Sequence, residues 1–153
     1  MPKAQRNFTD AESRIMKSGD GFVQGWNCQI AVDAAHQIIV AQAVTNQPPA
    51  VEHLNPLVRQ VVTNCGEVPA ATLGDAGYFS EKNVDAAVML GTDPYLATGR
   101  IKRGEPQLPV QETPSDELTA KQRMARKLAT TEGAAVYARR IAIVEPVFGQ
   151  SKG

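Results

Sequence analysis

The chain is short of the residues that build structural metal sites. It has 153 residues but only two cysteines, Cys28 and Cys65, and two histidines, with no Cys-x-x-Cys pair. A structural zinc site needs about four such ligands at defined spacings, so none is expected here. We expect both cysteines to be buried, reduced thiols. His36 and His53 are expected to be surface or turn residues.

Long apolar runs are also missing. No run approaches the roughly 20 residues that a membrane-spanning helix needs. Residues 1–7 lack the apolar centre of a signal peptide. We therefore expect a cytoplasmic protein with no membrane partner. Hydrophobic residues still make up 42% of the chain, which is enough for one domain with a real core.

The formal net charge is zero, but the charge is unevenly spread. Residues 1–98 hold 6 basic and 10 acidic residues, a balance of −4, whereas residues 99–153 hold 10 and 6, a balance of +4. A basic second half is compatible with contact to nucleic acid. The alternative is that these lysines and arginines only solvate helix faces, and charge by itself favours that alternative.

The first half of the chain predicts a β-hairpin. Residues 1–20 are polar and without clear period, and we expect them to lead into the domain. Residues 21–33 have the apolar and polar pattern of a strand, and residues 38–44 have that of its antiparallel partner. His36-Gln37 should form the turn between the two strands.

Helices and strands are expected to alternate after this hairpin. The first helix begins near Asn55, or near Val51 with a bend at Pro56, and ends at Gly66. The next elements are a strand over 69–74, a helix between Ser80 and Gly91, and a strand over 93–97. An exposed loop over 99–115 and a helix over 116–131 follow. A last helix begins beyond Gly133 and must kink or restart at Pro146. This order predicts an α/β fold with a mixed sheet.

Two isolated acids stand out as candidate site residues. Asp75 follows the predicted strand 69–74, and open α/β sheets place ligands at the carboxyl ends of their strands. The competing interpretation is a turn-forming aspartate ahead of Gly77. Glu145 interrupts an apolar run, which is costly unless the acid is paired or bound to metal. Lys152 follows seven positions later, close to two helical turns, so the two could share a helix face or form an ion pair.

Asp33 is a weaker third candidate. It ends the first predicted strand in the setting Val-Asp-Ala-Ala-His. That setting is typical of a hairpin turn, which is the interpretation we favour.

The chain resembles the C-terminal catalytic part of bacterial insertion-sequence transposases of the DDE type, in the branch with a Tyr–Arg–Glu–Lys signature. The matching motifs run in order along nearly the whole chain: Asn7-Phe-Thr-Asp10, Ser13-Arg-Ile-Met-Lys17, Gly25-Trp-Asn-Cys-Gln29, Ala31-Val-Asp33, Ile39-Val-Ala41, Val44-Thr-Asn46, Asp75-Ala-Gly-Tyr78, Met124, Lys127-Leu128 and Glu145-Pro-Val-Phe-Gly-Gln150. The motifs are specific as a set, although none is specific by itself.

The resemblance implies a ribonuclease-H-like fold in which three acids hold two divalent ions, Mg²⁺ or Mn²⁺. These ions assist cleavage and strand transfer at DNA phosphodiesters. Asp75 matches the second acid of the family and Glu145 matches the third. The signature residues that would contact DNA match Tyr137, one of Arg139 and Arg140, and Lys152. The implied partners are transposon ends and target DNA.

The first acid of the family has no match in residues 1–153. In the family it lies on an earlier strand, so the resemblance implies a partial catalytic domain without its first strand. We expect a truncated transposase that is inactive alone and that associates with itself or with a full-length transposase. Two alternatives are a non-catalytic remnant that binds DNA or transposase, and a stand-alone nuclease that uses Asp33, Asp75 and Glu145.

Overall fold

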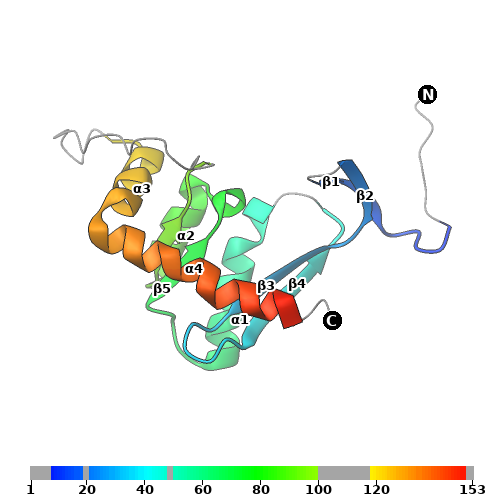
Figure 1. Cartoon of the computed structure of the whole chain (residues 1–153), viewed down its shortest axis with the longest axis horizontal. Coiled ribbons are helices and arrows are strands. Elements are labelled where there is room, and N and C mark those ends of the chain that lie inside the picture. Colours follow the sequence, from blue (N-terminus) through cyan, green and yellow to red (C-terminus); the bar gives the residue numbers. More distant parts are fainter. Residues whose placement is uncertain (1–7, 19–20, 48–49, 100–117, 151–153) are drawn as a thin grey trace.

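The computed structural model describes residues 8–18, 21–47, 50–99 and 118–150. Its strands pair in three two-stranded sheets (Figure 1). These are β1 (Arg14–Ser18) antiparallel to β2 (Gly21–Gly25), β3 (Asn27–Val32) antiparallel to β4 (Ile39–Thr45), and β5 (Ala71–Gly74) parallel to β6 (Asp93–Leu96). The prediction of a mixed α/β fold is therefore confirmed, although the described strands form three small sheets instead of one.

The single strand expected over 21–33 is wrong, because the chain forms two strands there. β2 pairs back with β1 and β3 pairs forward with β4, and Trp26 lies between them. The indole Nε1 of Trp26 donates to the Asp10 carboxylate at 2.8 Å. This contact fixes the chain between β2 and β3. The segment over 1–20 that was expected to lead into the domain thus includes β1.

The hairpin of β3 and β4 matches the prediction. Its turn is held by Asp33, whose Oδ2 accepts from the backbone nitrogens of Ala35 at 3.1 Å and His36 at 2.7 Å. Gln37 has a φ of 55°, in the left-handed region that non-glycine residues rarely adopt. The turn at His36-Gln37 is therefore confirmed, and it places Gln37 in a strained backbone conformation.

The helices begin and end largely where the local sequence predicts. They are η1 (Ala50–Glu52), α1 (Leu54–Cys65), η2 (Ala76–Tyr78), α2 (Glu81–Leu90), α3 (Ala120–Ala129) and α4 (Thr131–Gln150). Gly66 and Gly91 end α1 and α2 in left-handed conformation, as expected. Ser80 caps α2, because its hydroxyl accepts from Asn83 N at 3.1 Å. Asn55 is inside α1 and not its cap, since its amide donates to Asn83 Oδ1 at 3.0 Å.

Thr130, and not Gly133, separates the last two helices. Thr119 and Gln122 form a capping box at the start of α3, and α4 already begins at Thr131. Gly133 lies in the first turn of α4, where a Cβ atom would lie 1.9 Å from the carbonyl oxygen of Lys127. Glycine is required here because the two helix ends approach closely, and not because the helix stops.

The core consists of two clusters around the β5–β6 pair. Leu54, Val58 and Leu96 form the first, with α2 residues packed against it. The second contains Tyr95, Met124 and Leu128, and α4 packs onto it through Val136 and Tyr137. Figure 1 shows α4 crossing in front of the strands, and it contacts β3, β5 and β6.

Cys28 and Cys65 are exposed free thiols, so the prediction that they are buried is wrong. Cys65 is the last residue of α1, and Cys28 is the second residue of β3. The core is built from aliphatic and aromatic side chains, and neither thiol belongs to its two clusters. Among the described residues, no helix combines the length and the apolar character needed to cross a membrane.

Candidate metal and nucleic-acid site

Asp75 lies at the carboxyl end of β5, directly after Gly74. Gly74 is packed against the core, since a Cβ there would lie 2.8 Å from the Cδ2 atom of Leu96. The Asp75 Oδ1 atom accepts from Gly77 N at 2.9 Å and so holds the short helix η2. The side chain is exposed. Asp75 therefore forms the turn and also presents a carboxylate at the strand edge where α/β folds bind ligands.

A chain of side-chain hydrogen bonds connects the Asp75 turn to β3. The Tyr78 hydroxyl donates to the Gln29 amide oxygen, and Gln29 Nε2 donates to Asn27 Oδ1 at 2.6 Å. Gln29 is buried although it is polar. Burial raises the pKa of Tyr78, and the nearby Asp75 charge raises it further. The sequence pattern does not reveal this connection, because its members lie 49 positions apart.

Glu145 lies on α4, just before Pro146. The face of this helix turned towards the sheets carries side chains that are partly or fully buried: Tyr137, Arg140, Val144 and Val147. Glu145 is on the other side of the helix with Ile141 and Phe148, and its carboxylate is exposed. Because the carboxylate is exposed, it does not have the desolvation cost of an acid buried among apolar side chains.

Pro146 does not interrupt α4, which continues to Gln150. Of the kink or restart that the sequence predicts here, the restart is therefore wrong. Proline lacks an amide hydrogen and leaves the carbonyl of Ala142, four residues earlier, without its helical partner. The side chain of Gln37 replaces that partner, because its Nε2 donates to Ala142 O at 3.0 Å. The left-handed turn of the β3–β4 hairpin thus supports the helix one turn before Glu145.

The α4 residues that were expected to match the family signature lie in different environments. Tyr137 is half-buried against the second core cluster, and the Arg140 guanidinium lies 5.5 Å from its ring centre. Arg140 Nε is buried and has no hydrogen-bond partner among the described residues. Arg139 is exposed. The structure therefore associates Arg140, and not Arg139, with Tyr137. Lys152 lies outside the described residues.

Asp33 is occupied by its own turn. Besides its two backbone contacts, its Oδ2 lies 3.0 Å from Nδ1 of His36. These hydrogen bonds hold the pKa of Asp33 below its ordinary value. This geometry supports the interpretation of Asp33 as a turn residue. His36 is its exposed neighbour, as predicted, and His53 occupies the position before α1.

The carboxylates present have the right chemistry for Mg²⁺ but not the number that a two-metal site needs. Asp75 and Glu145 supply exposed oxygen atoms, which hard divalent ions prefer. The described residues contain no group of three or more acids, histidines or cysteines that could hold a metal ion. A stand-alone nuclease built on Asp33, Asp75 and Glu145 therefore has no support in the described part of the chain.

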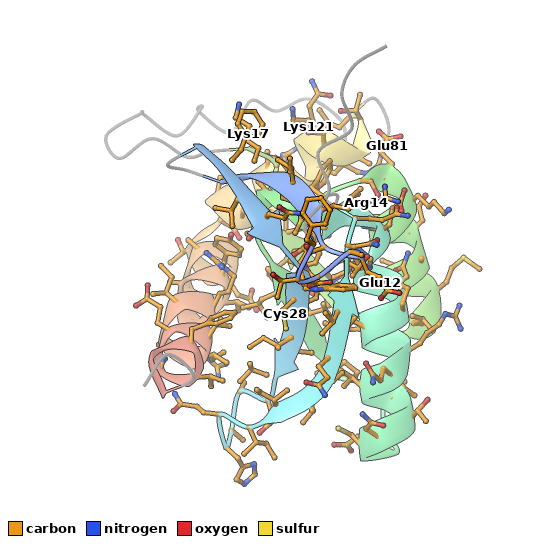
Figure 2. All side chains as sticks on the ribbon, turned by 90° about the vertical axis from the view of Figure 1, so that its right-hand side faces the viewer. Glu12, Arg14, Lys17, Cys28, Glu81 and Lys121 are labelled. Atoms are coloured by element: carbon orange, nitrogen blue, oxygen red, sulfur yellow. The ribbon has the colours of Figure 1, made fainter. Side chains whose placement is uncertain are left out.

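Helix α3 is strongly basic, and the sequence pattern did not indicate it as a site. Its ten residues include four cations and no acid: Lys121, Arg123, Arg126 and Lys127. Lys127 ties the helix to β6, because its ammonium contacts the Asp93 carboxylate and Pro94 O at 2.8 Å and lies over the Tyr95 ring. Lys121 remains exposed (Figure 2).

A shallow cavity of about 160 Å³ lies between α2, β6 and α3. It is smaller than the roughly 300 Å³ at which small-molecule sites begin. Apolar side chains such as Val84 and Met124 line it, with Arg123 and Lys127 at the edge. Nothing in this lining connects the cavity to Asp75 or Glu145.

The family model described as the transposase DDE domain matches residues 2–153, which is nearly the whole chain. No curated protein and no solved structure matches.

Proposed function

The chain belongs to the transposase DDE domain family, and from that premise we propose that it takes part in DNA transposition through Asp75 and Glu145. Asp75 would be the second acid of the family and Glu145 the third. The observation that carries the proposal is the position of Asp75, an exposed carboxylate at the end of a parallel strand, braced by η2 and Tyr78. Fixed geometry of this kind is what a metal ligand requires.

A divalent ion, Mg²⁺ or Mn²⁺, belongs to this proposal. When bound, such an ion activates the attacking oxygen and the phosphodiester. Asp75 accepts from Gly77 N through Oδ1, so its other oxygen would be the one available to hold an ion. A two-metal site needs a third acid, and the described residues contain no group of three or more possible metal ligands. We propose that this chain has a ribonuclease-H-like fold, is inactive alone and is completed by full-length transposase.

Arg140 supports the nucleic-acid side of the proposal. Its charge meets no carboxylate within the described residues, and its Nε lacks a hydrogen-bond partner there. A phosphate oxygen could accept the hydrogen bond that Arg140 Nε lacks, because arginine binds phosphate through paired N–H groups. Tyr137 orients Arg140 by stacking, and Arg139 and Lys152 would add further phosphate contacts. Cytoplasmic location is part of the same proposal.

Metal binding by the two acids can be tested with Mn²⁺ followed by electron paramagnetic resonance. We expect weak binding by the whole chain, and a large loss of affinity in Asp75→Asn and Glu145→Gln. Asp85→Asn is the matched control, because it removes the same charge from an exposed position of α2. Equal Mn²⁺ affinity in all four proteins would overturn the assignment of both acids.

Activity tests whether the unit is incomplete. The purified chain, incubated with supercoiled plasmid and Mg²⁺ or Mn²⁺, should neither nick the plasmid nor transfer strands. Robust cleavage that disappears in Asp75→Asn would show that the chain is complete and would overturn this part of the proposal. Cleavage that survives in Asp75→Asn would indicate a contaminating nuclease.

A second candidate function is DNA binding without catalysis. The acid-free helix α3 favours it, since four cations on ten residues suit a phosphate backbone. Binding that weakens steeply with salt, in a protein whose DNA affinity does not respond to Mn²⁺ or to Glu145→Gln, would favour this function over the first.

A further inference from the structure

The hairpin of β1 and β2 stands apart from the rest of the fold (Figure 1). Each strand pairs only with the other, and neither makes an extensive contact with any other described element. An isolated two-stranded hairpin is marginal in water, and both of its edges carry unpaired backbone groups. Phe22 is 79% exposed and Val23 is 55% exposed. Because consecutive strand residues point to opposite faces, a partner that covers one face of the hairpin would bury one of these two side chains.

The register of the hairpin defines one face that is wholly exposed. Ile15 lies opposite Gln24, and Lys17 lies opposite Phe22. Directly opposed residues share a face, and so do residues two apart on one strand, so these four side chains lie together. All four are exposed. On this face each strand therefore carries one apolar and one polar side chain: Ile15 and Lys17 on β1, and Phe22 and Gln24 on β2.

The two strands of the hairpin carry charge of one sign, while Asp20 lies between them in the sequence. Its ten strand residues include Arg14 and Lys17 and no acid. Neither cation forms an ion pair with a described residue. Of the acids before β1, Asp10 is held by Trp26 at the base of the hairpin. Figure 2 shows Lys17 near the end of the hairpin where the chain turns, and Arg14 towards the other end.

We propose that the β1–β2 hairpin is a DNA-contacting ribbon that lies in the major groove of duplex DNA. This inference rests on the proposed function, which supplies DNA as the partner. The major groove, about 12 Å wide, admits a two-stranded ribbon. Lys17 would meet phosphate or a guanine edge and Gln24 an adenine edge, while Phe22 and Ile15 would contact thymine methyl groups. The two strands contain no acid that would repel the phosphates.

A second copy of the chain fits this surface less well. Two hairpins that paired edge to edge would bring four strand cations together with no acid on either pair of strands. Like charges across strands are destabilising, and edge cations oppose strand pairing. A phosphate backbone provides the complementary charge that the strands of a second hairpin lack.

The test compares matched charge removals in the full chain. Binding to a short labelled duplex of mixed sequence is measured by fluorescence anisotropy across a series of salt concentrations. Lys17→Ala should lower the slope of log affinity against log salt by about 0.9, the effect of one lost phosphate contact. Lys82→Ala removes the same charge from the exposed surface of α2 and should leave the slope unchanged. Lys17→Arg should retain the slope, which excludes an effect of misfolding.

The contribution of the apolar side chains on this face is tested separately, with its own control variant. Phe22→Ala should weaken binding about tenfold, because a phenylalanine buried against DNA contributes on the order of 1.5 kcal/mol. Met89→Ala, at an 88% exposed residue of α2, should leave the affinity unchanged.

The outcomes separate this inference from the proposed function. If the wild-type chain binds DNA but Lys17→Ala and Phe22→Ala bind equally well, the hairpin assignment fails and the proposed function stands. If these variants leave DNA affinity unchanged and instead alter sedimentation of the chain, the face is a protein contact and the inference is overturned. Absence of all DNA binding by the wild type overturns both.

Discussion

The β5–β6 pair and the β1–β2 hairpin have strands of similar length but opposite environments. In β6, Tyr95 is 9% exposed and Leu96 is fully buried, whereas in β2 the apolar Phe22 is 79% exposed. The parallel pair requires a crossover, which α2 supplies, and the surrounding helices bury it. The antiparallel β1–β2 hairpin needs only a turn, and no described helix makes an extensive contact with it. Strand pairing alone does not determine stability, since the covering helices provide most of it.

This difference also separates two kinds of role. The covered pair ends at Asp75, whose geometry depends on a rigid support. The uncovered hairpin offers side chains that are free to meet a partner. Rigid placement suits the proposed metal ligand, and open placement suits the proposed DNA contact.

The largest effect should come from truncating equivalent apolar groups in the two strand pairs. Leu96→Ala should lower the free energy of unfolding by about 3 kcal/mol, because it empties a fully buried site. Phe22→Ala should change it by less than about 0.5 kcal/mol, since the ring is exposed in the isolated chain. Urea unfolding measures both. Similar losses for the two variants would show that the hairpin is packed in solution and would break the comparison.

The β3–β4 hairpin offers an intermediate case, because its turn is attached to α4. Gln37→Ala should cost about 1 kcal/mol by leaving Ala142 O without its donor. In a Pro146→Ala background the restored amide hydrogen can donate to that carbonyl, so the same change should cost only a few tenths of a kcal/mol. A double-mutant cycle by urea unfolding measures the coupling. An equal cost of Gln37→Ala in both backgrounds would refute the role assigned to Gln37.

The smallest effect concerns the base of the uncovered hairpin. The Trp26 indole, with help from the backbone N–H groups of Glu12 and Ser13, holds the pKa of Asp10 below its ordinary value of 3.8. Because the pKa is lower in the folded state, Asp10 contributes its full stabilisation above pH 3.8 and loses it as the pH falls through the lowered pKa. The indole N–H signal of Trp26 should titrate with a midpoint below 3.8, and Asp10→Asn should remove that step. A midpoint at 3.8 or above would contradict the contact.

Local signals predicted much of the fold correctly. Ser80, Gly66 and Gly91 act at the helix ends that they predicted, because capping depends on neighbouring residues in the chain. The separation between α3 and α4 was misplaced because Gly133 was interpreted as a helix breaker. Its small size instead serves a contact with Lys127 that is visible only when both helices are present.

The candidate site was predictable in part. Asp75 was found because a strand and a turn residue adjoin it in the sequence. The support from Tyr78 and Gln29 was not found, since two distant segments must meet before the hydrogen bond exists. The exposure of Glu145 could not be predicted, because apolar neighbours along a helix point in several directions and only some of them face the core.

The amino-acid sequence by itself determined the order of helices and strands, their caps, and the family to which the chain belongs, because these depend on residue types at short spacings. The tertiary structure decided which strands are covered, which carboxylates are exposed, and how Pro146 is accommodated within α4. Such properties arise from contacts between segments that are remote in the chain. Gln37 and Ala142 show the difference, since 105 positions separate a donor from the carbonyl that needs it.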